Sequence, residues 1–149
     1  MRHRRLTLLT VTALILVAAG CVRQAPAPPH PGVALDVDCD AAYCNISQLT
    51  WQGHIEPRHC TANCQADNKS IFIAAYCGGL ADAVSFCEQL MARPDCSGAN
   101  QPNGRIAFTA TFAASVGVDS RSACAATTAG TVIYDPGTQQ VVTQFPGLP

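Results

Sequence analysis

The sequence predicts an α+β domain, with a helical, disulfide-rich N-terminal half followed by a small antiparallel sheet. Seven of the eight cysteines beyond residue 36 fall between residues 39 and 96, in a region that also contains a clear helical repeat. Beyond residue 105, apolar residues alternate with polar or small ones, and a turn sequence separates two such runs. A block of helix followed by a block of strands is typical of an α+β fold.

The first 20 residues have the pattern of a lipoprotein signal peptide. Three arginines precede an apolar run from residue 6 to residue 19, which is the order of a secretory signal. At about 14 residues the run is shorter than the roughly 20 that a permanent membrane helix needs. The sequence Ala18-Ala19-Gly20-Cys21 resembles a lipobox, where a signal is cleaved before a cysteine that carries lipid. An ordinary cleaved signal with a nearby cysteine is the alternative.

Cleavage at this position gives a mature protein that starts at Cys21. We expect it in the cell envelope or outside the cell, attached to a bacterial membrane through lipid on Cys21. Residues 21–35 are predicted to be a tether, because four prolines between residues 22 and 31 favour an extended, semi-rigid chain. Residues 36–149 are long enough for a single domain with its own core. We expect this domain to be a monomer.

The cysteines support export. Nine is an odd number for a secreted protein, but assigning Cys21 to lipid leaves an even set that suits four disulfides. The remaining eight are Cys39, Cys44, Cys60, Cys64, Cys77, Cys87, Cys96 and Cys124. About 105 pairings are available to eight cysteines, so the sequence leaves their connectivity open. A zinc site near His54, His59, Cys60 and Cys64 is the alternative, but the chain has no C-x-x-C spacing. We therefore expect no metal and no cofactor.

Residues 80–92 are predicted to form the clearest helix. Leu80, Ala83, Val84, Cys87, Leu90 and Met91 repeat at helical spacing on one face. Gly78-Gly79 and Pro94 are suitable boundary residues. Residues 71–73 form a short apolar run that is buried in either a strand or a helix end.

The second half is predicted to be a sheet. Residues 106–112 alternate with a period of two, and Val116 and Val118 are expected to continue that strand after a bend. Residues 131–134 and 140–145 flank Asp135-Pro136-Gly137-Thr138, a sequence that favours a hairpin turn. On the last strand, Val141, Thr143 and Phe145 are expected to share one face.

The charge balance excludes a broad nucleic-acid-binding surface. From Cys21 onward, six basic residues stand against ten acidic ones, a formal net charge of −4. Proteins that bind nucleic acid over a broad surface are usually strongly basic. Any chemistry on nucleic acid must therefore come from a local site.

Two histidines and one lysine are the notable candidates for such a site. His54 and His59 are the only histidines after the tether, and Lys69 is the only lysine. A histidine pair can supply one general base and one general acid, while Arg58 or Lys69 neutralises charge on a phosphorane or an oxyanion. The alternative is that both histidines are polar surface residues near a disulfide. No Gly-x-Ser-x-Gly, Walker or dinucleotide-binding motif occurs.

Four motifs occur in an order that resembles a known group. They are Gly53-His54 with Arg58-His59, Asn68-Lys69-Ser70-Ile71-Phe72, residues 104–108 leading to residues 116–119, and residues 131–135 with residues 141–146. This series resembles the small ribonuclease toxin domains of the barnase, EndoU, colicin and RelE group over residues 53–147. The bacterial EndoU-like domains are the most similar, and the bacterial ribonuclease A-like toxin domains are also similar. Phe145 departs from the group, which has tyrosine there.

The resemblance implies an endoribonuclease that cleaves RNA by attack of the ribose 2'-hydroxyl, leaving a cyclic phosphate. It implies catalytic roles for His54, His59 and Lys69, with Thr143 binding phosphate. Arg58 and Phe145 are then expected to contact the substrate. RNA and a protein inhibitor or envelope partner are the expected partners. The alternative function is a non-catalytic envelope lipoprotein that binds a protein or peptide.

Overall fold

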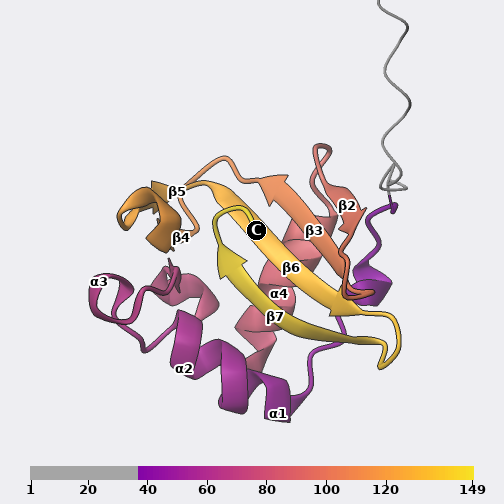
Figure 1. The fold of residues 1–149 in the computed structure, drawn as a ribbon, viewed down its shortest axis with the longest axis horizontal. Helices are drawn as coiled ribbons and strands as arrows, with labels where there is room; N and C mark the ends of the chain where they lie inside the picture. The colour runs from indigo at the N-terminus through magenta and orange to yellow at the C-terminus, as the bar shows by residue number, and fades with distance from the viewer. Residues whose placement is uncertain (1–36) are drawn as a thin grey trace, which may run out of the picture. The chain divides into compact units, whose positions relative to one another are not determined.

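The computed structural model describes residues 37–149, which form an α+β domain with two antiparallel sheets (Figure 1). The predicted fold class is thus confirmed, with the helical region mainly before the large sheet. The predicted signal peptide, the lipidated Cys21 and the tether lie outside the described residues. Within residues 37–149, no helix has the length and apolar character needed to cross a membrane.

The large sheet has four strands in the order β2–β3–β6–β7, all antiparallel. These strands are β2 (Ser97–Asn100), β3 (Ile106–Thr111), β6 (Ala129–Asp135) and β7 (Gln140–Pro146). The small sheet has the order β1–β4–β5, formed by β1 (Ile71–Phe72), β4 (Gly117–Asp119) and β5 (Ala125–Thr127). The predicted hairpin turn joins β6 to β7, as expected.

The helical elements precede or interrupt the sheets. They are η1 (Ala41–Tyr43), α1 (Gln48–Thr50), the π-helical η2 (Trp51–Ile55), α2 (Glu56–His59), α3 (Cys64–Asp67), η3 (Ala74–Tyr76), α4 (Leu80–Met91) and η4 (Ser120–Ser122). Helix α4 packs across one face of the large sheet, whereas α1, η2 and α2 lie beside β7 (Figure 1). The other face of the large sheet is free of α4.

Helix α4 supplies most of the helical side of the core. It spans Leu80–Met91, one residue shorter than predicted, and its buried face includes Ala83, Cys87, Leu90 and Met91 as expected. The prediction omitted Phe86, which is fully buried and packs edge-on against Phe72 with ring centroids 4.6 Å apart. Burial of such an aromatic side chain is worth roughly 1.5–3 kcal/mol.

The predicted continuation of β3 through Val116 and Val118 is wrong. Val118 pairs with Ile71 on one side and with Ala126 on the other, so this segment is the centre of the small sheet. The chain leaves the large sheet after Thr111 and forms β4 in a separate sheet. The alternation of apolar residues shows which face is buried but does not specify the partner strand.

The shared face predicted for the last strand is correct for Thr143 and Phe145 and wrong for Val141. A register shift between Ile133 and Tyr134 places Val141 opposite Tyr134, and Thr143 opposite Ile133. Val141 is 1 % exposed and belongs to the core, on the same side as Gln144. Compared with a regular strand, one extra residue moves the side chains before it to the opposite face of the sheet.

All eight described cysteines are joined in four disulfides, which confirms the prediction of an even, oxidised set. The pairs are Cys39–Cys96, Cys44–Cys87, Cys60–Cys77 and Cys64–Cys124. Because Cys60 and Cys64 are both oxidised, the zinc alternative at these positions is excluded. Disulfides in this number are typical of proteins in the cell envelope or outside the cell.

Candidate active site

His59 is the centre of the candidate site. It is the last residue of α2 and is only 8 % exposed. Its Nδ1 lies 2.8 Å from the carbonyl oxygen of Ser70, and its Nε2 lies 3.4 Å from Oγ1 of Thr143. A carbonyl oxygen only accepts hydrogen bonds, so Nδ1 carries the proton. In the neutral ring, Nε2 is therefore the free acceptor.

A π-helical turn sets the position of His54 relative to His59. In a regular α-helix, residues five positions apart point about 140° away from each other. Here the amide of Glu56 donates to the carbonyl of Trp51, a bond across five residues, directly before Pro57. Proline cannot continue the ordinary bonding pattern because it has no N–H. The wider turn brings the ring centroids of His54 and His59 to 6.2 Å.

The bulge in the β6–β7 hairpin presents Thr143 and Phe145 to the same site. Both lie on the face of the large sheet opposite the core, where Thr143 contacts His59. The ring of Phe145 lies 5.7 Å from that of His59, with an interplanar angle of 32°. Phe145 therefore forms an aromatic wall beside the imidazole.

Lys69 enters the site from the segment between α3 and β1. Asn63 caps α3 by accepting from the amides of Gln65 and Ala66, and Asn68 ends the helix in the left-handed conformation with φ 51°. The chain then turns into Lys69 and Ser70. Ser70 is buried, and its hydroxyl donates to Asp119 at 3.2 Å and accepts from the amide of Ser120 at 3.1 Å.

An open pocket of about 250 Å³, the His59 pocket, lies at this site. Its lining comprises His59, Asn68, Lys69, Ser70, Asp119, Ser120, Arg121, Phe145 and Leu148. Two chain segments, residues 68–70 and 119–121, form facing polar walls. The volume is slightly below the about 300–1,000 Å³ typical of pockets for drug-sized ligands.

Comparison of the chain with protein-family models, with curated proteins and with solved structures found no match. The chemistry of the site must therefore be derived from its own geometry and charge.

The pKa values of both histidines are lowered. Burial lowers the pKa of His59 to about 4, helped by the charges of His54, Arg58 and Lys69 and opposed by the hydrogen bond with Ser70. For His54, burial is again the largest cause of a lowered pKa, followed by the charges of Arg58, Lys69 and Arg105. His59 is therefore neutral at physiological pH.

Four of the five cations of the described domain lie at or near this site. Residues 37–149 contain five basic side chains, at positions 58, 69, 93, 105 and 121. Lys69 and Arg121 line the pocket, and Arg58 and Arg105 are near enough to affect His54. Arg93 is the exception and lies over the ring of Phe112, 6.0 Å from its centroid. An acidic domain thus carries a local positive site.

The structure places His54, His59, Lys69, Thr143 and Phe145 together, although they are up to 91 positions apart in the printed sequence. Arg58 is exposed on α2 and acts on both histidines through its charge without lining the pocket. Within residues 37–149, no group of three or more His, Cys, Asp or Glu side chains is arranged to hold a metal ion.

Sequence reasoning did not assign site roles to Ser70, Asp119, Ser120, Arg105 and Arg121. Ser70 acts through its backbone carbonyl, which no side-chain pattern reveals. The scarcity of basic residues was the available signal for Arg105 and Arg121, because in an acidic domain each cation is conspicuous.

Proposed function

We propose that the protein is a secreted, lipid-anchored endoribonuclease that cleaves RNA by attack of a ribose 2'-hydroxyl on the adjacent phosphate. The proposal is carried mainly by one observation. His59, Lys69 and Arg121 line an open pocket of an acidic domain, with the ring of His54 beside that of His59 and with Arg58 and Arg105 near enough to act on His54 through their charge. A site of this kind suits a substrate with negative phosphates and a reaction that moves protons.

His59 takes the role of general base. Its Nδ1–H is fixed by the Ser70 carbonyl, so Nε2 is the acceptor and lies beside Thr143. The 2'-hydroxyl gives its proton to this Nε2 as the new bond from O2' to phosphorus forms. A base with a pKa of about 4 is weak, but it is unprotonated throughout the physiological range.

His54 takes the role of general acid. The bond from phosphorus to O5' breaks, and His54 delivers a proton to the leaving oxygen, so that a 2',3'-cyclic phosphate and a free 5'-hydroxyl result. The neighbouring cations lower the pKa of His54 in the free protein. A bound phosphodiester has the opposite charge and raises that pKa, which favours the protonated form when substrate is present.

Lys69 and Thr143 act on the charge that develops at phosphorus. Lys69 lines the pocket, and Thr143 offers a hydroxyl next to the base. Groups placed where negative charge grows stabilise the transition state more than the ground state. Arg58 and Arg105 are expected to hold phosphates on either side of the reacting one.

The test is cleavage of an end-labelled RNA by the purified oxidised protein and by its His54→Gln/His59→Gln variant. Glutamine at position 59 retains a donor for the Ser70 carbonyl, so the variant should stay folded. Cleavage by the parent alone, with cyclic phosphate ends, is the expected result. No cleavage by a folded, fully oxidised parent would contradict the proposal and favour a non-catalytic binding protein.

A further inference from the structure

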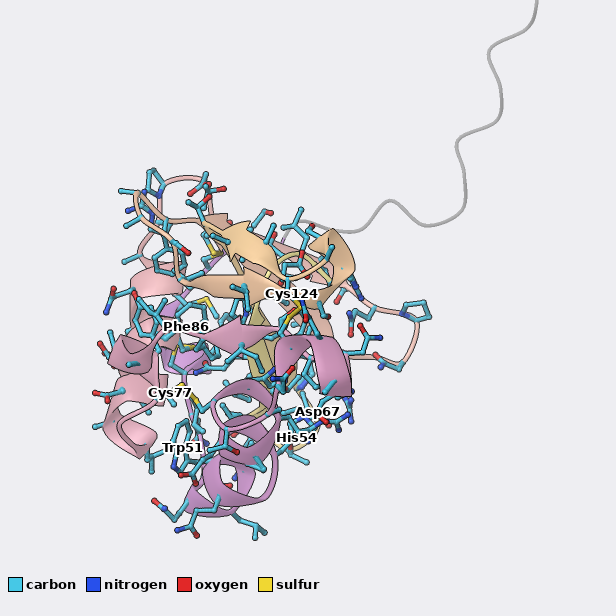
Figure 2. All side chains as sticks on the ribbon, turned by 90° about the vertical axis from the view of Figure 1, so that its left-hand side faces the viewer. Trp51, His54, Asp67, Cys77, Phe86 and Cys124 are labelled. Atoms are coloured by element: carbon cyan, nitrogen blue, oxygen red, sulfur yellow. A yellow bond between two sulfur atoms is a disulfide. The ribbon has the colours of Figure 1, made fainter. Side chains whose placement is uncertain are left out.

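The four disulfides differ in what they join. Cys39–Cys96, Cys44–Cys87 and Cys60–Cys77 all belong to the hydrophobic core or pack against it. Cys64–Cys124 does not, and its two half-exposed cysteines lie at the small sheet, with Cys124 above the helix of His54 in Figure 2. This bond is therefore the one disulfide of the described residues that lies outside the hydrophobic core.

The Cys64–Cys124 bond connects the two polar walls of the His59 pocket. Cys64 begins α3, which runs directly into the wall of residues 68–70. Cys124 follows η4, which carries Ser120 and Arg121 of the opposite wall. The disulfide thus closes a ring that contains both walls.

Apart from the disulfide, the outer ends of these walls are held by short elements and local hydrogen bonds, such as that from Arg121 to the Leu148 carbonyl. Helix α3 has four residues, too few to be stable by itself. Ala123 and Cys124 both adopt left-handed backbone, with φ 53° and 62°, which costs energy for residues other than glycine. The two walls are also joined directly, by two β1–β4 residue pairs and by the hydrogen bonds of Ser70 with Asp119 and Ser120.

We propose that the Cys64–Cys124 disulfide is a latch that holds the two polar walls of the His59 pocket in their catalytic positions, so that the enzyme is inactive without this bond. This regulation rests on the proposed ribonuclease function.

The latch forms by thiol–disulfide exchange with a small-molecule disulfide such as oxidised glutathione. The thiolate of one cysteine attacks the oxidant to give a mixed disulfide, and the second cysteine thiolate displaces the bound thiol. Two protein thiols lose two protons and two electrons, and one glutathione disulfide becomes two glutathione thiols. Both cysteines are partly exposed, as this exchange requires.

The test compares two double variants of the full chain. Cys64→Ala/Cys124→Ala removes the latch, and Cys39→Ala/Cys96→Ala is the matched control, because the two bonds span 60 and 57 positions. Removal should therefore affect the entropy of the unfolded chain almost equally. We expect the latch variant to lose roughly a hundredfold in kcat/KM, as misplaced catalytic groups do. The control should keep its activity while folded.

A second readout separates the latch from the ribonuclease proposal. Titration of the His59 ring by NMR should give a pKa of about 4 in the parent and the control, and a value nearer the ordinary 6.5 in the latch variant, where the ring is less buried. Unchanged activity and an unchanged His59 titration in the latch variant would overturn the latch, as would equal losses in both variants. If the parent cleaves no RNA but only the latch variant shifts His59, the latch stands and the ribonuclease proposal fails.

Discussion

The proton on the His59 ring is placed by one backbone carbonyl. Ser70 has a buried main chain between α3 and β1, and its oxygen faces Nδ1 at 2.8 Å. This arrangement decides which ring nitrogen is available to a substrate. Burial makes the charged form of His59 unfavourable and outweighs the hydrogen bond with Ser70, which favours that form.

Stability should depend on pH through His59. Its pKa is about 4 in the folded protein and 6.5 in the reference state, so the unfolded chain binds a proton that the folded one does not. This contribution is fully present above pH 6.5 and is lost as pH falls toward 4. For a shift of this size it amounts to about 3 kcal/mol at most. Urea unfolding at pH 4.5 and pH 7.5 measures it.

His59→Gln is the control for this pH dependence, because it retains a donor and cannot titrate. The difference in unfolding free energy between the two pH values should be smaller in the variant than in the parent. An equal difference in both proteins would show that His59 is not the group responsible.

Lys69→Met should reduce RNA cleavage without unfolding the domain. Lys69 lines the pocket, and loss of a single donor to transition-state charge typically costs about 10²–10³ in kcat. Arg93→Met is the matched control, because Arg93 is the cation that lies on Phe112 away from the pocket. The measurement is kcat and KM on one RNA substrate. Equal losses of kcat in the two variants would mean that the net charge of the domain, and not the position of Lys69 in the pocket, determines activity.

Two irregular elements bring the catalytic side chains together. The π-helical turn before Pro57 aligns His54 with His59, and the bulge in the β6–β7 hairpin turns Thr143 outward while Val141 stays in the core. Irregularities of both kinds are frequent at functional sites, where they redirect a side chain. In a regular helix and a regular hairpin, these residues would face different directions.

Strand β4 has close contact with its neighbours at Gly117. A Cβ there would collide with the backbone oxygen of Ile71 and with the ring of Pro146. At Gly130 of β6, a Cβ would meet side chains and no backbone, the nearest being that of Phe86 at 2.7 Å. Gly117→Ala should therefore cost more stability than Gly130→Ala, for which overpacking of about 1–3 kcal/mol is expected.

Chemical denaturation of both glycine variants measures this difference. Because Asp119 and Ser120 lie two and three residues after Gly117, Gly117→Ala should also weaken RNA cleavage in the protein that remains folded. A smaller loss of stability for Gly117→Ala than for Gly130→Ala would contradict the described β1–β4 pairing.

The distribution of charge limits how RNA can bind. The domain is acidic, and Arg58, Lys69, Arg105 and Arg121 are the cations at the site. With four phosphate contacts at most, the logarithm of affinity should fall with the logarithm of salt concentration with a slope of about −3 or shallower. Fluorescence anisotropy with a labelled oligonucleotide and the double histidine variant measures this slope. A much steeper slope would require a basic surface that the described residues do not provide.

Full reduction should unfold the domain or leave it far less stable. Its four disulfides span 17, 43, 57 and 60 positions, and each is expected to contribute about 2–4 kcal/mol. Their sum is comparable to the about 5–15 kcal/mol stability of a typical domain. Thermal unfolding followed by circular dichroism, with and without a reducing agent, tests this expectation. An unchanged melting curve after complete reduction would contradict a stabilising role for the disulfides.

Local sequence patterns were enough to predict the α+β class, helix α4, the β6–β7 turn and the oxidised state of the cysteines. Each depends on the sequence itself: the helical repeat of residues 80–91, the turn residues 135–138 and the even set of eight cysteines beyond residue 36. The candidate residues His54, His59, Lys69 and Thr143 were also selected from the sequence, through their scarcity and a resemblance.

Tertiary structure alone decided the disulfide pairing, the second sheet and the geometry of the site. Val118 lies in the small sheet because β4 pairs with β1, where its partner Ile71 is 47 positions earlier in the sequence. Val141 and Thr143 point in opposite directions because one residue bulges out of the hairpin. The Ser70 carbonyl bonds His59, and Arg121 lines the same pocket, through contacts between distant segments. Such contacts depend on how complete elements pack, and the residues of one segment do not by themselves specify which distant segment they will contact.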